Sequence, residues 1–196
     1  MASTLVIACG ALARELRDIV AVNQLDFVNI EYLPAKLHNT PKDITAAVAA
    51  RIERARGRYE RVFVGYADCG TGGELDRLLA KEGIERLPGA HCNAFYATIP
   101  VFEAIQAAEP GTFYLTDYLV RCFDHIVIRG LGFDSDRELR DAYFSNYRRV
   151  MHLAQLDDPL LEQAGRDAAR RLDLDYERTL VGYGDLETAI VGLRST

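Results

Sequence analysis

Apolar runs alternate with segments of helical periodicity along the N-terminal half of the chain. A short apolar or β-branched run bounded by turn residues predicts a buried strand, and apolar residues spaced three and four apart predict a helix. These patterns predict strands at Thr4–Ala8, Asp26–Leu33 and Arg61–Tyr66. They predict helices at Ala11–Val22, from Pro41 to about Gly57, and at Glu74–Lys81. Each strand is therefore followed by a helix.

The same alternation continues more loosely in the C-terminal half. We expect a helix at Phe102–Ala108, a strand at Thr112–Leu115, a helix capped by Thr116 that runs to about Val127, and helices at Ser135–Gln155 and Pro159–Leu172. Alternating strands and helices favour an α/β fold with a mainly parallel sheet flanked by helices. We expect one layered domain over residues 1–196, because no linker or low-complexity segment interrupts the pattern.

Two segments share a short motif. Residues 61–71 read RVFVGYADCGT, and residues 178–188 read RTLVGYGDLET. If this is a repeated strand and turn, the VGY-x-D part belongs to the scaffold, and Cys69 and Gly70 are what the first copy adds. Cys9-Gly10 also follows an apolar run directly. Both cysteines would then lie at the carboxyl ends of strands, where open α/β sheets bind their ligands.

Composition narrows the class of protein. The formal net charge is -6, which argues against a nucleic acid or an anionic membrane as the main partner. No segment has the apolar length of a membrane span, and no export signal is recognisable at the N-terminus. The four cysteines are widely separated, which favours reduced thiols or metal thiolates over disulfides. We therefore expect a cytoplasmic protein.

Thiol and imidazole side chains are grouped in predicted loops and strand ends. Such ligands suit zinc or another thiophilic divalent metal, and a catalytic zinc site needs only three of them. The candidate ligands are Cys9, His38, Cys69, His91 and Cys92, with His91 and Cys92 as alternatives. Their spacing matches no short zinc motif, so the fold would have to assemble the site. We interpret Cys122, His125 and His152 as structural.

Cys69 also admits a different chemistry. A thiol before the GTGG turn would have its pKa lowered by a helix N-terminus, and His38 or His91 could act as its base. Asp68 is placed to act as an acid–base carboxylate or to orient a ligand, so we expect Asp68 and Cys69 to take part in catalysis. The glycines match neither the Walker nor the dinucleotide motif.

Further polar and glycine positions complete a candidate substrate pocket. We expect Gly10 and Gly70 to border it beside the cysteines, and Asp117, Asn146 and Tyr147 to supply polar groups. The alternative interpretation is that these polar side chains are ordinary groups on the surfaces of helices.

An ordered set of motifs resembles a known family over most of the chain. The segments are ACGALA, LHNTP, VGYADCGTGG, GAHC, GTFYLTDYL and YFSNYRRVMHLAQ. They resemble the bacterial and archaeal family called domain of unknown function 1638, and Cys9, His38, Cys69, His91 and Cys92 match its pattern. Residues 93–97 read NAFYA where many members carry an aromatic residue and a glutamate, so a role for that glutamate does not carry over. Gene neighbourhood of the family in anaerobes implies partnership with corrinoid-dependent methyl-transfer systems.

These observations lead to three hypotheses. The first is a metal-dependent enzyme, with zinc as the expected ion, that acts on a small molecule in methylated-compound or one-carbon metabolism. The second is a non-catalytic accessory protein that binds a metal or corrinoid, or a methyltransferase partner, although no corrinoid-binding motif is present. The third is a metal-free cysteine hydrolase or transferase. A homodimer is a further expectation, since mid-sized α/β proteins often pair symmetrically.

Overall fold

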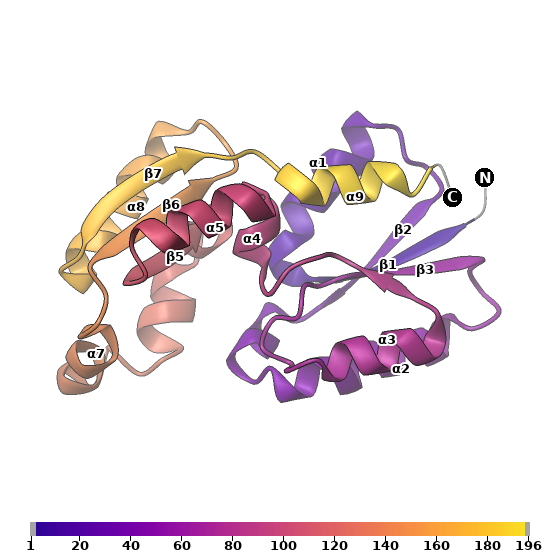
Figure 1. Cartoon of the computed structure of the whole chain (residues 1–196), viewed down its shortest axis with the longest axis horizontal. Coiled ribbons are helices and arrows are strands. Elements are labelled where there is room, and N and C mark those ends of the chain that lie inside the picture. Colours follow the sequence, from indigo (N-terminus) through magenta and orange to yellow (C-terminus); the bar gives the residue numbers. More distant parts are fainter. Residues whose placement is uncertain (1–2, 195–196) are drawn as a thin grey trace. The chain divides into compact units, whose positions relative to one another are not determined.

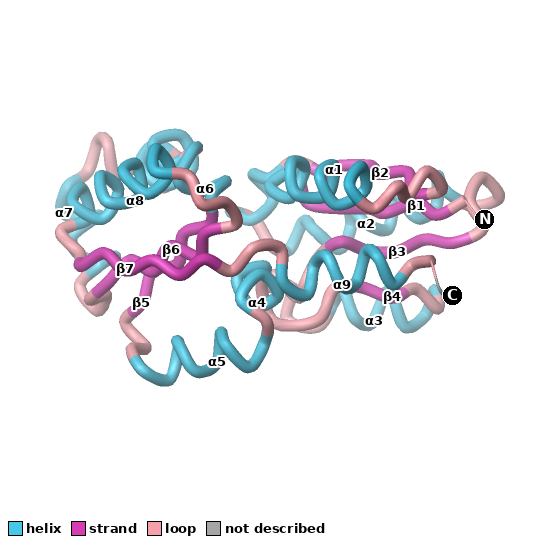
Figure 2. Tube along the Cα trace, turned by 90° about the horizontal axis from the view of Figure 1, so that it is seen from above, coloured by secondary structure: helices cyan, strands magenta, loops and turns pink. Residues whose placement is uncertain are grey.

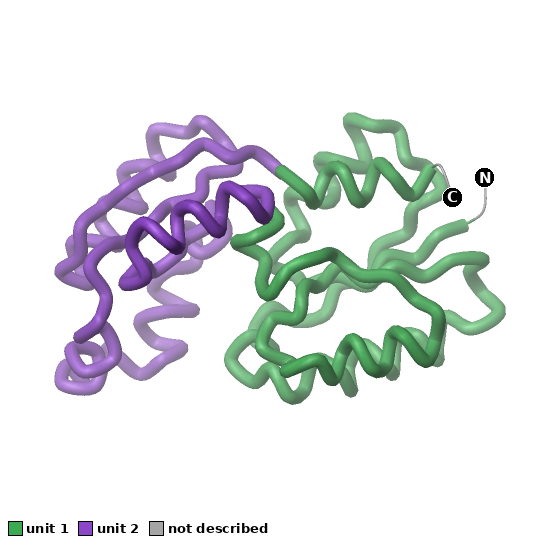
Figure 3. The backbone as a smooth tube through the Cα atoms, in the orientation of Figure 1, with its two compact units in different colours: residues 1–95, 184–196 green, residues 96–183 purple. Residues whose placement is uncertain are grey.

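The chain divides into two compact units in a computed structural model that describes residues 3–194. The first unit comprises Met1–Phe95 with Gly184–Thr196, and the second comprises Tyr96–Tyr183 (Figure 3). The C-terminal segment thus returns to the unit in which the chain begins. The expectation that residues 1–196 form one domain stays a prediction.

The first unit contains a four-stranded parallel sheet in the order β2-β1-β3-β4. Its strands are β1 (Thr4–Cys9), β2 (Val28–Leu33), β3 (Arg61–Gly65) and β4 (Glu85–Arg86). Its helices are α1 (Ala13–Val22), α2 (Lys42–Ala55), α3 (Glu74–Glu82) and α9 (Gly184–Gly192), and α4 (Cys92–Ala97) begins in this unit. Helices α1 and α9 lie together on one face of the sheet, and α2 and α3 lie on the other (Figure 1).

Strand β1 is the centre of this unit. Every residue of TLVIAC is buried, as expected for a parallel strand covered on both faces. Ala8 is paired with Gly65, so the carboxyl ends of β1 and β3 lie side by side. A Cβ atom on Gly65 would lie 2.9 Å from the Cβ of Ala8, so only glycine fits this close approach. The residues that follow β1 and β3 therefore emerge next to each other.

The second unit contains a three-stranded parallel sheet in the order β5-β6-β7 (Figure 2). Its strands are β5 (Thr112–Thr116), β6 (Arg149–Ala154) and β7 (Asp175–Leu180). Its helices are α5 (Ile99–Ala108), α6 (Asp117–Arg121), a π-helix at Asp124–Arg129, α7 (Arg137–Phe144) and α8 (Pro159–Leu172). The α/β class and the parallel strands are confirmed, but the strands form two sheets.

One predicted element is wrong. The segment Ser135–Gln155 is not one helix. Helix α7 ends at Phe144, and strand β6 begins at Arg149. Leu139 and Tyr143, which lie four residues apart in helix α7, are exposed. Strand β6 lies between β5 and β7, and every residue of its VMHLA run is buried. Such continuous burial is typical of a central parallel strand.

Two smaller expectations also need correction. The helix capped by Thr116 ends at Arg121, and a π-helical turn follows it. His125 is exposed in that turn and Cys122 is only half-buried, so neither is a core residue. Within residues 3–194, the helices are too short or too polar to cross a membrane.

Candidate functional site

Three of the four cysteines line one small cavity in the first unit. The cavity has a volume of about 10 Å³, which is close to the space that one water molecule or one ion occupies. Its chemically reactive lining consists of Cys9, His38, Tyr66, Cys69 and Cys92. These side chains come from four distant segments of the sequence. The grouping of Cys9, His38, Cys69 and Cys92 expected from the sequence is thus found in space.

Cys9 is the last residue of β1 and is 3% exposed. Its Sγ atom accepts a hydrogen bond from the N–H of Ala11 at 3.4 Å and lies 3.5 Å from Nδ1 of His38. Burial raises the pKa of the Cys9 thiol to about 11, although the N–H of Ala11 acts in the opposite direction. In the metal-free chain Cys9 is therefore a protonated thiol at neutral pH.

Cys69 lies in the loop between β3 and α3, with a backbone φ of 51°. This left-handed conformation is uncommon for a residue with a side chain. It is held by the N–H of Cys69, which donates to the carbonyl oxygen of Ala90 at 2.7 Å, and by the N–H of Asp68, which donates to Gly89 at 3.1 Å. Burial foremost, and then the charge of Cys9, raise the pKa of the Cys69 thiol to about 12. The expected lowering of this pKa by a helix N-terminus is therefore wrong.

Asp68 organises the loop that carries Cys69. Its carboxylate accepts hydrogen bonds from the Thr71 hydroxyl at 2.7 Å and from the N–H groups of Gly73 at 2.9 Å and Gly70 at 3.2 Å. These hydrogen bonds, that of Thr71 foremost, lower the pKa of the Asp68 carboxyl, which is ionised at neutral pH. The residues that line the cavity do not include Asp68. Its position favours a role in holding the loop over the expected role in proton transfer.

The sequence analysis left Cys92 and His91 as alternative metal ligands, and the two residues differ in their position relative to the cavity. Cys92 begins α4 and lines the cavity, whereas His91 does not line it. Burial raises the pKa of the Cys92 thiol, and the charges of Cys69 and Cys9 raise it further. Cys92 is therefore close enough to both other cysteines for their charges to act on it. Burial lowers the pKa of the half-buried His91.

His38 lies in a short 3-10 helix at Ala35–Asn39. Its Nδ1 atom is 3.2 Å from the carbonyl oxygen of Ala35. A carbonyl oxygen can only accept, so this contact requires a proton on Nδ1 and leaves the lone pair on Nε2. Nε2 is buried and has no hydrogen-bond partner within residues 3–194. Burial also lowers the pKa of His38, so a neutral imidazole presents an unpartnered lone pair.

Tyr66 is a member of the site that the sequence analysis assigned to the scaffold. It follows β3, is 1% exposed, and its ring stacks on His38 with centroids 6.2 Å apart. Its hydroxyl makes no full hydrogen bond within the described chain, yet it lies close enough to Cys9 to lower the pKa of that thiol. The VGY motif alone gave no signal for this role, because Tyr183 occupies the same place in the second copy.

The donor types fit a thiophilic ion, but the side chains do not yet surround one. Within residues 3–194 no group of three or more His, Cys, Asp or Glu side chains is arranged so that it could hold a metal ion. All four cysteines are free. The three thiols of the cavity and the unpartnered Nε2 of His38 are nevertheless the groups that zinc prefers. Coordination would require these side chains to move toward one another.

The glycines expected to border a substrate have packing roles. A Cβ atom on Gly10 would lie 3.0 Å from the carbonyl oxygen of Leu33, so Gly10 lets β1 leave the sheet close to this backbone. Gly70 has a φ of 83°, and a Cβ atom there would lie 3.3 Å from the ring of Pro41. Neither glycine lines the cavity.

The other expected substrate residues belong to the second unit and do not line the cavity. Asn146 is exposed, and Tyr147 packs edge-on against Phe113 and Phe144. Asp117 is fully buried and its Oδ1 atom lies 2.9 Å from Nε2 of His152. The structural interpretation of His152 agrees with this contact, although His152 lies on a strand and not on a helix.

Asp117 and His152 form the core of a polar network in the second unit. The N–H of Asp117 donates to Gln155 at 2.8 Å, and Nδ1 of His152 lies 2.9 Å from the Tyr176 hydroxyl. Oδ2 of Asp117 accepts from the N–H of Leu156 at 3.0 Å. Because each of these buried groups has a partner, the network stabilises the unit and specifies its packing.

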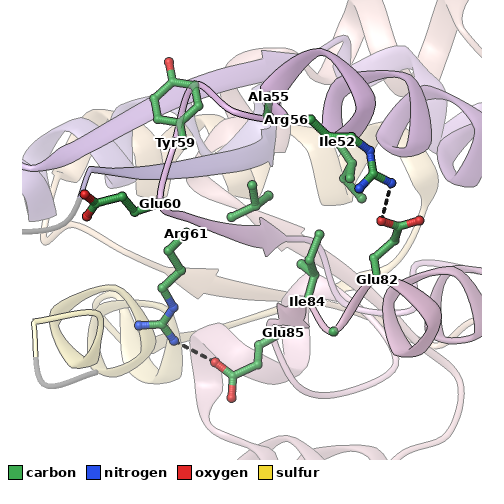
Figure 4. Close-up of a pocket in the computed structure, with 11 residues that line it drawn as sticks. Ile52, Ala55, Arg56, Tyr59, Glu60, Arg61, Glu82, Ile84 and Glu85 are labelled. Carbon is green, nitrogen blue, oxygen red and sulfur yellow. Dashed lines mark hydrogen bonds and ion pairs between the residues drawn. The ribbon is translucent and has the colours of Figure 1, made fainter.

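A larger cavity of about 390 Å³ lies elsewhere in the first unit (Figure 4). It is lined by two ion pairs, Arg56 with Glu82 and Arg61 with Glu85, around an apolar floor that includes Ile84. Arg61 and Glu85 are the first residues of β3 and β4, so this cavity is at the amino ends of the strands. Ligands of open α/β sheets bind at the carboxyl ends. The cysteine-lined cavity is therefore the better candidate site.

Comparison with known proteins identifies one family. The sequence profile of a family described as "Protein of unknown function (DUF1638)" matches residues 32–190. His38, Cys69, His91 and Cys92 lie inside the matched region, and Cys9 precedes it. No curated protein and no solved structure matches the chain.

Proposed function

The chain is a member of the DUF1638 family, and we propose that it binds a thiophilic divalent ion, with zinc as the first choice, and acts on a small molecule. In this proposal Cys9, Cys69 and Cys92 hold the ion through sulfur, and His38 holds it through Nε2. His91 is not a ligand.

The observation that carries this proposal is the convergence of soft donors on one cavity. Cys9, His38, Cys69 and Cys92 come from segments far apart in the sequence, yet all line the same space of about 10 Å³. A buried cysteine by itself often packs as a small apolar residue. Three cysteines that line one small space together with a histidine whose Nε2 atom is buried and has no hydrogen-bond partner within residues 3–194 are better explained by a shared ligand.

Electrostatics support a cation in this space. Burial raises the pKa of each of the three thiols, and the charge of Cys9 also raises the pKa of Cys69 and of Cys92. A divalent cation between the sulfurs would reverse this effect, because it stabilises the thiolate forms and releases protons on binding. The neutral imidazole of His38 is already in the form that a metal requires.

The surroundings supply the remaining requirements of a site. Phe95, Leu12 and Ala11 line the cavity with apolar groups and limit the access of water. Asp68 fixes the loop and holds Cys69 in its left-handed conformation. When bound, such an ion supplies Lewis acidity or activates a water molecule or a thiolate. A methylated or one-carbon substrate, and a corrinoid or methyltransferase partner in the cytoplasm, belong to this proposal through the family resemblance.

A second candidate function follows from the number of donors. Structural zinc sites use four protein ligands, whereas catalytic sites leave one position open. If His38 joins all three cysteines, the site is closed and the chain serves as a metal-binding accessory protein. If His38 orders the site without binding the ion, a position is open for a substrate.

Titration with Co²⁺ tests the proposal, because cobalt replaces zinc and gives thiolate-to-metal absorption bands. The expected result is about one Co²⁺ per chain, and each of C9S, C69S and C92S should weaken binding by more than the 10-fold or so typical of losing an outer hydrogen bond. C122S and H91N serve as matched controls that keep the bands. In H38A, a lowered coordination number would favour the closed site. The absence of thiolate bands, or equal damage by C122S, would overturn the proposal.

A further inference from the structure

The hydroxyl of Tyr66 is a buried polar group at the cysteine-lined cavity that the proposed ligand set does not use. Tyr66 is 1% exposed, and its hydroxyl has no full hydrogen bond within residues 3–194. Buried hydroxyls almost always have a partner, so an unpaired one at a cavity suggests a partner that forms only in the loaded protein.

We infer that Tyr66 is a positioning residue whose hydroxyl donates a hydrogen bond to the thiolate of Cys9 when the ion is bound. This inference rests on the proposed metal site. A neutral thiol is a weak acceptor, which leaves the hydroxyl without a full partner in the metal-free chain. A thiolate is a strong acceptor, so loading the site would complete this hydrogen bond.

The position of Tyr66 makes Cys9 the acceptor. Ala8 is paired with Gly65, so the residues that follow them, Cys9 and Tyr66, are neighbours at the carboxyl end of the sheet, and both line the cavity. The ring of Tyr66 is nearly parallel to that of His38, with an interplanar angle of 19°. Cys9 and His38 are themselves 3.5 Å apart. Tyr66 is thus held by its ring against one proposed ligand and directs its hydroxyl to another.

Such a hydrogen bond would change the charge on the Cys9 sulfur and thus its bond to the ion. Three thiolates carry more negative charge than a divalent ion neutralises, and a hydrogen bond to sulfur withdraws part of the excess. The N–H of Ala11 already donates one such bond to Cys9. The Tyr66 hydroxyl adds a second, which lowers the electron donation of this sulfur and raises the energy of its charge-transfer band.

The test compares Y66F with Y59F, because Tyr59 lines the cavity at the amino ends of the strands. Phenylalanine keeps the ring and removes only the hydroxyl. Y66F should bind Co²⁺ about 10-fold more weakly and should shift the charge-transfer band to lower energy, whereas Y59F should match the unaltered protein. In a C9S background, Y66F should have no further effect, as a double-mutant cycle would show.

A second measurement needs no substitution at Tyr66. Incorporation of 3-fluorotyrosine makes the hydroxyl a stronger donor, so the band should move in the direction opposite to that in Y66F. An unchanged band and affinity in Y66F, or no band shift with fluorotyrosine, would overturn the role of Tyr66 alone. Failure of the unaltered protein to bind Co²⁺ would instead overturn the metal site and this inference together.

Discussion

The carboxylate of Asp68 accepts a hydrogen bond from the N–H of Gly73 at 2.9 Å, so the last residue of the loop between β3 and α3 is tied back to Asp68. The same oxygen accepts from the Thr71 hydroxyl. Cys69 lies inside this closed loop, and its sulfur reaches the cavity because the backbone is held in a left-handed conformation. The position of Cys69 therefore depends on Asp68.

Replacement of Asp68 by alanine should destabilise the protein and weaken metal binding. Loss of several hydrogen bonds to a partly exposed carboxylate should lower the free energy of unfolding by about 1–2 kcal/mol. D68N should lose less, because an amide oxygen can still accept from Thr71 and Gly73. Urea unfolding and Co²⁺ titration of both variants measure these effects. Unchanged stability and affinity in D68A would show that the loop does not need this carboxylate.

The thiols of the cavity should react slowly in the metal-free protein. With pKa values of about 11 and about 12, Cys9 and Cys69 are thiolates in only about one molecule in a thousand and one in ten thousand at pH 8. Alkylation by iodoacetamide should therefore accelerate roughly tenfold per pH unit above pH 8, because only the thiolate reacts.

Peptide mapping by mass spectrometry after timed alkylation provides this measurement. Half-buried Cys122 is the internal reference and should be labelled before Cys9. Rapid and selective labelling of Cys69 at pH 7 would contradict this expectation. It would instead support the hypothesis of a metal-free cysteine hydrolase or transferase.

The alternation of strands and helices could be predicted from local sequence because each element carries its own signal. Helix α8 begins and ends where the pattern predicts, at Pro159 and Leu172, with Asp158 as its N-cap. Strand β6 was missed because a fully buried parallel strand reads as a continuous apolar run, which periodicity cannot separate from a helix. The division into two sheets depends on pairing between distant segments, which local patterns do not encode.

The candidate site was partly predictable for a similar reason. Cysteines at the ends of β1 and β3 are marked by apolar runs that stop at Cys-Gly or shortly before it, and a parallel sheet brings such ends together. Tyr66 was missed because nothing in the VGY motif distinguishes a packed tyrosine from one with an unpaired hydroxyl. The contacts of Asp68 within its loop could not be predicted, because its partners are the Thr71 hydroxyl and backbone N–H groups whose positions depend on the conformation of the loop.

Gly165 of α8 should be essential for the polar network of the second unit. A Cβ atom there would lie 3.0 Å from the Tyr176 hydroxyl and 3.1 Å from Nδ1 of His152. G165A should separate this pair and lower the free energy of unfolding by about 1–3 kcal/mol. This cost exceeds the gain of about 1 kcal/mol that alanine usually brings to a helix.

Gly192 in α9 is the matched control. A Cβ atom there would meet no atom within 4 Å, so G192A should be neutral or slightly stabilising. Thermal and urea unfolding of both variants provide the comparison. Equal stability of G165A and the unaltered protein would show that the His152–Tyr176 contact does not constrain the fold.

The metal content of the protein as it comes from cells tests the central claim most directly. Protein purified without a histidine tag and without chelators should contain about one zinc or other thiophilic ion per chain by elemental analysis. A C9S/C69S/C92S triple variant purified in the same way should contain none, while C122S should match the unaltered protein. A folded preparation of the unaltered protein that holds no ion, and takes up none when zinc is added, would contradict the account.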